Sequence, residues 1–304
     1  MGWNPSQLPS FDDKQVIVTG ANSGIGWPTA AELARHGASV TLACRNLTKA
    51  EQAADRIRAV VPGARVRAAE LDLASLASVT KFAVAWSEPL HLLVNNAGVM
   101  APPQWRTTED GFELQFGTNH LGHFALTGQL LAPLLAAEAA RVVTVSSLAH
   151  RSGSATVIEG NPPDTYNPTR AYANSKLANL LFGLELQRRA SAHGSALTST
   201  VAHPGLSATN LFLSKDGIGA NSVVRGLGAV FGHVVLQSAK AGANATLYAA
   251  AAAEPGSYTG PGWFGESRGP VGPSRIGPLG QDAALAAELW DVSEQFTGVH
   301  FNWT

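Results

Sequence analysis

Short runs of apolar residues alternate along the chain with longer stretches in which apolar residues recur at helical spacing. Such runs, bounded by turn residues, are typical of buried parallel strands, and the stretches between them of helices that cover the sheet. Strands are expected at residues 16–19, 39–43, 65–69, 91–94, 141–146 and 197–202, with a seventh near 257–259. Helices are expected at residues 25–36, 48–60, 76–86, 111–137, 172–192, 239–252 and 282–296. The pattern predicts an α/β protein with a doubly wound, mostly parallel, seven-stranded sheet and helices on both faces. Because no linker interrupts it, we expect one domain over residues 1–304.

Two segments break this alternation. Residues 151–170 are polar and carry Pro162, Pro163 and Pro168, which predicts a loop between a strand and the next helix. Residues 206–237 mix glycine with apolar residues and show weak periodicity. Long irregular segments inside a domain are often lids or binding loops.

The first predicted strand leads into a glycine-rich turn and then a helix. The sequence there is Thr-Gly-Ala-Asn-Ser-Gly-Ile-Gly, residues 19–26. Glycines permit a tight turn and a close approach of a pyrophosphate, and the helix N-terminus offers free N–H groups to phosphates. Glycines also mark ordinary turns, but the order of strand, turn and helix favours a dinucleotide site. The residues concerned are Gly20, Asn22, Ser23, Gly24, Ile25 and Gly26.

The end of the second predicted strand indicates which nicotinamide nucleotide is used. An acidic residue there commonly holds the ribose 2′-hydroxyl of NAD. This chain has Ala43-Cys44-Arg45-Asn46 and no carboxylate. An arginine can pair with a 2′-phosphate, so we expect NADP(H) to be preferred over NAD(H), with a solvated surface arginine as the alternative for Arg45.

Tyr172 and Lys176 stand four residues apart near the start of a predicted helix, so they project from the same face. A lysine ammonium near a phenol favours the phenolate and lowers the phenol pKa from about 10. Such a tyrosine can exchange a proton with a carbonyl or alcohol oxygen. A tyrosine and a lysine at this spacing are common in helices. The pair therefore indicates proton transfer only in combination with the motifs around it.

Those motifs occur in the order seen in short-chain dehydrogenases/reductases, and the chain resembles that family from about residue 14 to residue 259. The motifs are residues 19–26, Asn95-Asn96-Ala97-Gly98, Asn119, Ser146-Ser147, Tyr172 with Lys176, and Pro204-Gly205. The resemblance is greatest to the retinol-dehydrogenase-like branch and its bacterial relatives, and it implies a Rossmann-type fold. It is carried by Leu42-Ala43-Cys44-Arg45, by residues 119–124 (NHLGHF), by residues 145–150 (VSSLAH) and by residues 175–179 (SKLAN).

The resemblance also implies residue roles. Tyr172 would be the catalytic acid/base, and Lys176 would lower its pKa and bind the nicotinamide ribose. Ser147 would hold the substrate oxygen, with Ser146 as the alternative, and Asn119 would anchor a water in a proton relay. The implied cofactor-binding residues, besides those of the glycine-rich turn and Arg45, are Asp72, Leu73, Asn95, Ala97, Gly98, Tyr172, Lys176, Pro204, Gly205 and Thr209.

Two features depart from the family's usual pattern. Ser147 and Tyr172 are 25 residues apart, a longer spacing that the retinol-dehydrogenase-like branch shares. Trp27 and Pro28 follow the last glycine of the turn. Proline is tolerated in the first turn of a helix, so the fold is expected to be kept.

Composition and charge exclude several classes of function. The formal net charge of −1 gives no basic face for nucleic acid, and a single cysteine, Cys44, permits no intramolecular disulfide. Residues 1–11 are polar, which predicts neither a secretory signal nor an integral membrane segment, so we expect a cytoplasmic protein. His120, His123, His150 and His203 match no set of metal ligands, so no metal is expected.

The leading functional interpretation is a carbonyl reductase or alcohol dehydrogenase that acts on a small, apolar carbonyl or alcohol substrate. The alternatives are a reductase of the protochlorophyllide type and a catalytically idle nucleotide-sensing or interaction protein on the same fold. Because residues 206–237 follow the motif that the resemblance places beside the nicotinamide, they are predicted to form a substrate lid. A helical excursion on the core and a membrane-touching patch are the alternatives. Helices 111–137 and 172–192 form a dimer surface in many relatives, which leaves a homo-oligomer open.

Overall fold

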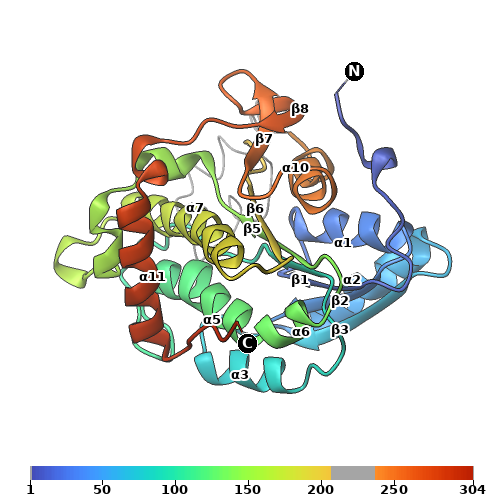
Figure 1. Cartoon of the computed structure of the whole chain (residues 1–304), viewed down its shortest axis with the longest axis horizontal. Helices are drawn as coiled ribbons and strands as arrows, with labels where there is room; N and C mark the ends of the chain where they lie inside the picture. The colour runs from blue at the N-terminus through green and yellow to red at the C-terminus, as the bar shows by residue number, and fades with distance from the viewer. Residues whose placement is uncertain (1, 207–236, 304) are drawn as a thin grey trace.

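The computed structural model describes residues 2–206 and 237–303, and its strands form one sheet with the order β3-β2-β1-β4-β5-β6-β7-β8 (Figure 1). The neighbours from β3 to β7 run parallel, and β8 pairs antiparallel with β7. The strand bounds are β1 Gln15–Thr19, β2 Ser39–Cys44, β3 Arg65–Glu70, β4 Leu92–Asn95, β5 Arg141–Val145, β6 Thr198–Ala202, β7 Tyr258–Trp263 and β8 Arg268–Pro273. The predicted fold class is confirmed, with eight strands in place of seven.

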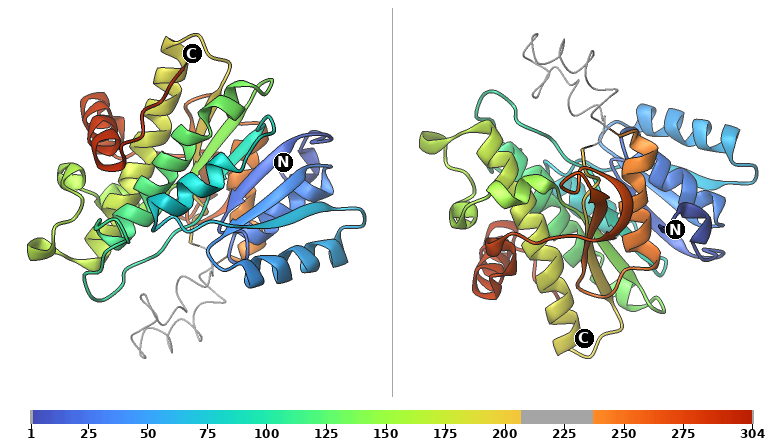
Figure 2. Two further views of the ribbon diagram at one scale, coloured as in Figure 1. Left: turned by 90° about the horizontal axis from the view of Figure 1, so that it is seen from below. Right: turned by 90° about the horizontal axis from the view of Figure 1, so that it is seen from above.

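Helices cover both faces of the sheet, as Figure 2 shows from two sides. One layer consists of α1 Gly26–Arg35, α2 Leu47–Val60 and α10 Ala239–Ala251, and the other of α3 Leu76–Val84, α5 Gly122–Gln129, α6 Leu131–Leu135 and α7 Pro168–Ala192. Successive strand residues face opposite layers: Val16 and Val18 of β1 belong to the first core, whereas Ile17 belongs to the second. The last helix, α11 Ala283–Thr297, packs on α7.

Short helical elements lie between the long helices and strands along the chain and before β1. They are α4 Leu114–Phe116, the π-helical turn η2 Gly117–Leu121, and the 3₁₀ turns η1 Pro5–Gln7, η3 Leu148–Ser152, η4 Ala155–Glu159, η5 Pro163–Thr165 and η7 Pro278–Gln281. Three of these 3₁₀ turns lie between β5 and α7, where the sequence predicted a plain loop.

The prediction of a single helix at residues 111–137 is wrong. The chain there forms α4, η2, α5 and α6 in succession. Pro133 lacks the N–H that would bond the carbonyl of Gln129, and its ring would clash with that carbonyl, so α5 ends at Gln129. The wide turn η2 separates α4 from α5, and such turns occur often at functional sites.

The eighth strand was not predicted because β8 is Arg-Gly-Pro-Val-Gly-Pro, without an apolar run. Proline is compatible with an edge strand, and β8 lies at the edge of the sheet. The predicted lid falls outside the described residues except at its ends, Leu206 and Gln237, whose backbones are hydrogen-bonded at 2.9 Å (N to O). Within residues 2–206 and 237–303, no helix has the length and apolar character that crossing a membrane requires.

Candidate active site

A cavity of about 490 Å³ opens around the carboxyl ends of the parallel strands, where the strand order reverses between β1 and β4. Ligands of doubly wound proteins bind at such a point. The predicted residues that line it are Gly20, Asn22, Ser23, Gly24, Ile25, Arg45, Asp72, Leu73, Ala97, Gly98, Ser147, Tyr172, Lys176, Pro204 and Gly205. Residues from seven separate segments thus surround one space.

The glycine-rich turn is shaped to admit a phosphate. Gly20 has a φ of +66°, and a Cβ there would lie 2.9 Å from the Cα of Ala97, so a side chain is excluded by both strain and space. Helix α1 begins at Gly26, and its N-cap residue Ile25 makes no side-chain capping bond. A helix start without a side-chain cap next to the cavity fits the pyrophosphate of a dinucleotide.

Asn96, which the sequence interpretation left out of the site, holds this turn against the end of β4. The backbone N–H groups of Asn96 and Ala97 each donate to the Thr19 hydroxyl at 2.9 Å, and the Asn96 amide donates to the Thr19 carbonyl at 2.7 Å. Asn95 instead is fully buried, does not line the cavity, and donates to the Thr127 hydroxyl at 3.0 Å. Gly26 also lies outside the lining. Which asparagine of a pair faces a cavity depends on the strand's register, and the motif alone does not reveal it.

Arg45 lies at the end of β2, exposed, and lines the cavity. Asn46 follows it and caps α2 by accepting from the Lys49 N–H at 2.9 Å, which ends the strand at this point. Among the described residues that line the cavity, Asp72 is the one carboxylate, and its Oδ1 accepts from the Ala74 N–H at 2.9 Å. The Cys44 thiol is buried, which raises its pKa and gives no sign of an activated thiol.

The cavity lining also includes the groups able to transfer a proton, Ser147, Tyr172 and Lys176. Helix α7 begins at Pro168, earlier than predicted, because Asn167 caps it by accepting from the Arg170 N–H at 3.0 Å. Tyr172 and Lys176 follow in the next turns, and the Lys176 Nζ lies 5.9 Å from the centre of the Tyr172 ring. The Ser147 hydroxyl is hydrogen-bonded to that of Tyr172.

The hydrogen bonds of Ser146 and Ser147 distinguish the roles of these two neighbouring serines. Ser146 is buried, and its hydroxyl donates to the Lys176 carbonyl at 2.7 Å, which ties β5 to α7. The Ser147 hydroxyl accepts from the Ala149 N–H at 3.2 Å and keeps its own proton for Tyr172 or a ligand. Of the two, Ser147 is the one placed for chemistry.

Burial is the main influence on the pKa values of Tyr172 and Lys176. Desolvation raises the pKa of Tyr172 to about 12, opposed by the hydrogen bond from Ser147, and it lowers the pKa of Lys176 to about 8. The lowered phenol pKa expected from the sequence is therefore not found in this structure. Lys176 donates to the Val145 carbonyl at 3.1 Å, and desolvation is the largest influence on the pKa of both side chains.

Asn119 lies behind the cavity wall, in η2. Its amide donates to the Val99 carbonyl and the Ser175 hydroxyl, both at 2.9 Å, and its Oδ1 accepts from the Val99 N–H at 2.7 Å. A Cβ added to Gly98 would lie 3.2 Å from this Oδ1 and 3.6 Å from the Lys176 Nζ, so Asn119 and Lys176 are close. Since both ends of the amide are bound to protein, the water-anchoring role of Asn119 stays a prediction. Thr209 lies outside the described residues.

The histidines near the motifs have protein partners. His123 bridges the Thr19 hydroxyl at 2.9 Å and the Asn119 carbonyl at 2.8 Å, and burial lowers its pKa to about 4. In the described ranges no group of three or more His, Cys, Asp or Glu side chains could hold a metal ion.

Lys176→Met is expected to abolish turnover and yet raise the free energy of unfolding at pH 7 by about 0.5–2 kcal/mol, the range of single stabilising substitutions. The buried ammonium is charged below its pKa of about 8, whereas the ordinary value is 10.5. The unfolded chain therefore binds more protons between these values, and the stability of the wild type rises with pH across that window. The Val145 carbonyl keeps a partner in the Asn179 amide at 3.1 Å.

Urea denaturation at pH 7 and pH 9 measures this effect, with Lys81→Met on the exposed face of α3 as the control. A Lys176→Met protein less stable than that control would contradict the assigned cost of burying the ammonium.

Comparison with known proteins gives consistent matches. A family model described as short chain dehydrogenase matches residues 14–216. Retinol dehydrogenase 13 of Homo sapiens is 42% identical over 291 residues, which cover 94% of this chain and 85% of that protein. Polyprenol dehydrogenase of Mus musculus is 41% identical over 304 residues, which cover 97% of this chain and 87% of that protein.

Solved structures match as well. An uncharacterized protein from Mycobacterium Paratuberculosis is 43% identical, with a TM-score of 0.82, and the match covers 99% of this chain and 100% of that one. The complex of Pseudomonas aeruginosa RhlG with NADP is 25% identical, with a TM-score of 0.61, and the match covers 82% and 94% of the two chains.

Proposed function

The chain belongs to the short-chain dehydrogenase/reductase family, in its retinol-dehydrogenase-like branch, and on that premise we propose that it is an NADP(H)-dependent oxidoreductase that interconverts an apolar aldehyde or ketone with the alcohol. The observation that carries the proposal is the meeting of Ser147, Tyr172 and Lys176 with the glycine-rich turn and Arg45 in the lining of one cavity.

The residues present fit a dinucleotide. The uncapped start of α1 and the glycine-rich turn are suited to the pyrophosphate, Asp72 and Arg45 to the adenosine end, and Lys176 to the nicotinamide ribose. When bound, the nicotinamide supplies or accepts the hydride. The protein's own part is to hold the substrate oxygen and to move one proton.

Tyr172 would perform that proton transfer. During reduction its hydroxyl gives a proton to the carbonyl oxygen as a hydride reaches the carbonyl carbon, and the product is the alcohol. The Ser147 hydroxyl lies beside it and would donate a hydrogen bond to the same oxygen. Lys176 would stabilise the resulting phenolate by its positive charge.

An apolar substrate is supported by the walls and by the relatives. The cavity is lined by Val99, Met100, Leu148, Ala149 and Leu206 in addition to the polar groups. Retinol and polyprenol, which name the relatives, are apolar alcohols. A substrate with a long hydrocarbon portion suits such a surface.

Arg45→Asp is expected to weaken NADPH binding by about 10- to 100-fold, because it replaces a charge-assisted partner of the 2′-phosphate by a repelling carboxylate. NADH binding should change far less, so the preference should fall or reverse. Fluorescence titration of each nucleotide measures both constants, and Lys81→Asp, with the same change of charge away from the cavity, is the control. Equal affinity of the wild type for NADPH and NADH would refute the proposed preference.

A panel of apolar aldehydes, ketones and alcohols, followed by the absorbance of the nicotinamide, tests the proposed activity. We expect NADPH to be consumed with at least one long-chain or ring-bearing carbonyl compound. Nucleotide binding without turnover of any member would instead indicate a protein that senses or stores the nucleotide.

A further inference from the structure

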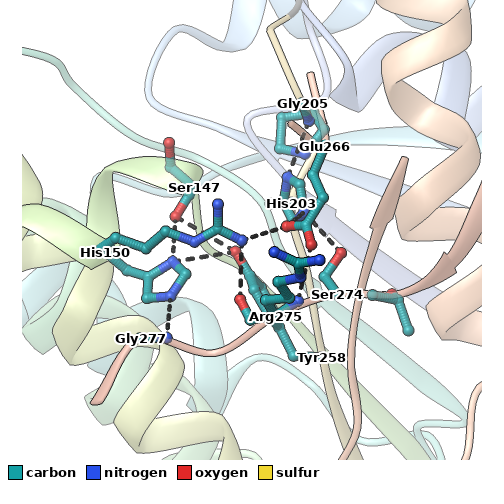
Figure 3. Close-up of polar contacts among 12 residues, drawn as sticks. Ser147, His150, His203, Gly205, Tyr258, Glu266, Ser274, Arg275 and Gly277 are labelled. Atoms are coloured by element: carbon teal, nitrogen blue, oxygen red, sulfur yellow. Dashed lines mark hydrogen bonds and ion pairs between the residues drawn. The ribbon is translucent and has the colours of Figure 1, made fainter. Parts of the chain in front are cut away.

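The segment that follows residue 256 makes polar contacts that lead to two residues of the cavity lining, Ser147 and Gly205 (Figure 3). It lies beyond the residues that the family model matches, which end at 216. Tyr258 of β7 reaches the backbone of Ser147, and Ser274, after β8, reaches His203, which binds the backbone of Gly205. Ser147 and Gly205 both line the cavity.

His150 has a defined tautomer. The Gly277 N–H, which can only donate, lies 3.1 Å from the His150 Nε2, so this nitrogen accepts and carries no proton. A neutral ring then carries its proton on Nδ1, which lies 2.7 Å from the Ser147 carbonyl oxygen and donates to it. The side chain is buried, and burial lowers its pKa, which keeps the ring neutral.

Tyr258 supports the same carbonyl from the sheet. Its hydroxyl donates to the Ser147 carbonyl oxygen at 3.3 Å and lies equally far from the His150 Nδ1. The ring lies between two imidazoles, with centroid distances of 5.2 Å to His150 and 5.1 Å to His203. Both groups therefore fix the peptide that carries the Ser147 hydroxyl.

His203 holds the backbone of Gly205, and it does so with the opposite tautomer. The Gly205 N–H donates to its Nδ1 at 3.2 Å, so the proton is on Nε2, which lies 2.9 Å from the Ser274 hydroxyl. The ring is fully buried, and burial lowers its pKa to about 3. A Cβ on Gly260 of β7 would lie 1.9 Å from this Nε2, so only glycine leaves room for the ring.

An ion pair joins the turn between β7 and β8 to η3. Glu266, at the turn between β7 and β8, pairs with Arg151, accepts from the Arg275 N–H at 3.0 Å, and lies 3.8 Å from the His203 Nε2. Glu266 has a φ of +67°, a strained conformation for a residue with a side chain. Strain of this kind persists only where surrounding contacts hold it, and here they join the turn to η3.

We propose that His150, Tyr258 and His203 are positioning residues, neutral side chains through which the segment after residue 256 fixes the backbones of Ser147 and Gly205, both of which line the active site. The role rests on the proposed function, because Ser147 is the residue whose hydroxyl must meet the substrate oxygen. Displacement of a reacting group by about 1 Å can cost 100-fold in rate, so a rigid Ser147 peptide has catalytic value.

Two substitutions at His150 distinguish the effect of its hydrogen bonds from the effect of its side-chain volume. His150→Phe keeps a ring of similar size and removes both polar contacts, and kcat is expected to fall about tenfold or more, with the NADPH dissociation constant within about twofold. His150→Asn places an amide N–H near the position of Nδ1, so kcat should recover to within about threefold of the wild type. An equal loss in both variants, or none in His150→Phe, would overturn the proposal.

The pH profile of alcohol oxidation provides a second readout. If the Ser147 hydroxyl moves, Tyr172 loses the hydrogen bond that opposes the effect of burial on its pKa, so the profile of His150→Phe should shift to higher pH. Among the described residues, the other titratable groups shown to interact with Tyr172 are Lys176 and Tyr258, and neither is substituted in this variant. Tyr258→Phe, which removes only the hydroxyl, should shift the profile in the same direction, and it serves if His150→Phe does not fold. An unchanged profile in the folded variants would count against the role.

NMR of the ring nitrogens in histidine-labelled wild type tests the geometry without any turnover. His150 should carry its proton on Nδ1 and His203 on Nε2, and both should stay neutral below the ordinary histidine pKa of about 6.5. A positively charged ring of either histidine at a pH just below about 6.5, or the opposite tautomer of either ring, would overturn the inference even if the enzyme is active. Correct tautomers in a protein that turns over nothing would instead count against the proposed function alone.

Discussion

Tyr172→Phe is expected to lower turnover by about 10²- to 10⁴-fold, the usual contribution of a positioned acid or base. The substitution keeps the ring and removes the proton that the carbonyl oxygen needs. NADPH binding should be largely retained, because the glycine-rich turn, Arg45 and Lys176 are unchanged. Steady-state rates at saturating NADPH, together with a fluorescence titration of the nucleotide, measure the two quantities separately.

Tyr166→Phe is the matched control for this prediction. Tyr166 also has a pKa raised to about 12 by burial, but its hydroxyl donates to the Pro102 carbonyl at 2.8 Å and it does not line the cavity. Turnover of this control should stay near that of the wild type. If Tyr172→Phe keeps more than about a tenth of the wild-type turnover, another group supplies the proton and the assignment is wrong.

Trp290→Ala is expected to lower the free energy of unfolding by about 3–5 kcal/mol, as is usual when a buried aromatic side chain is removed. Trp290 of α11 is 2% exposed. Its ring contacts Phe124, Phe182 and Phe301, with centroid distances of 5.1, 5.8 and 4.4 Å, and the Arg189 guanidinium lies 4.5 Å from its centre. Phe182 and Arg189 belong to α7, so the cavity left behind would loosen the helix that carries Tyr172 and Lys176.

Urea denaturation measures the loss through the shift of the midpoint. Val84→Ala serves as the control, because Val84 is 80% exposed at the end of α3 and its truncation should change stability by less than about 0.5 kcal/mol. A Trp290→Ala protein as stable as that control would mean that α11 does not hold α7 in place.

The parallel sheet and the glycine-rich turn were predictable because their signals are local. The strands β1, β2, β4 and β5 are short, mainly apolar runs, and the turn of Gly20 and Gly24 stands directly between a strand and a helix. The family resemblance rested on ordered motifs and is confirmed by the match of residues 14–216.

The remaining features depend on contacts between distant residues. Strand β8 has no apolar pattern, and its place is set by pairing with β7. The pKa of Tyr172 depends on desolvation by surrounding atoms, which outweighs the effect of the lysine one turn away. The contacts of His150 with Gly277, and of Tyr258 with Ser147, join residues more than a hundred positions apart. The positions of these residues in the sequence give no sign that they meet.

Transfer of deuterium from the nicotinamide to the product tests the central claim most directly. Wild-type protein would be incubated with NADPH deuterated at the transferable position and with an apolar aldehyde identified from the panel, and the alcohol would be analysed by mass spectrometry. A nicotinamide oxidoreductase delivers the label as hydride, so the account predicts one deuterium on the former carbonyl carbon. Alcohol formed without deuterium, or no alcohol from a protein that binds NADPH, would contradict it.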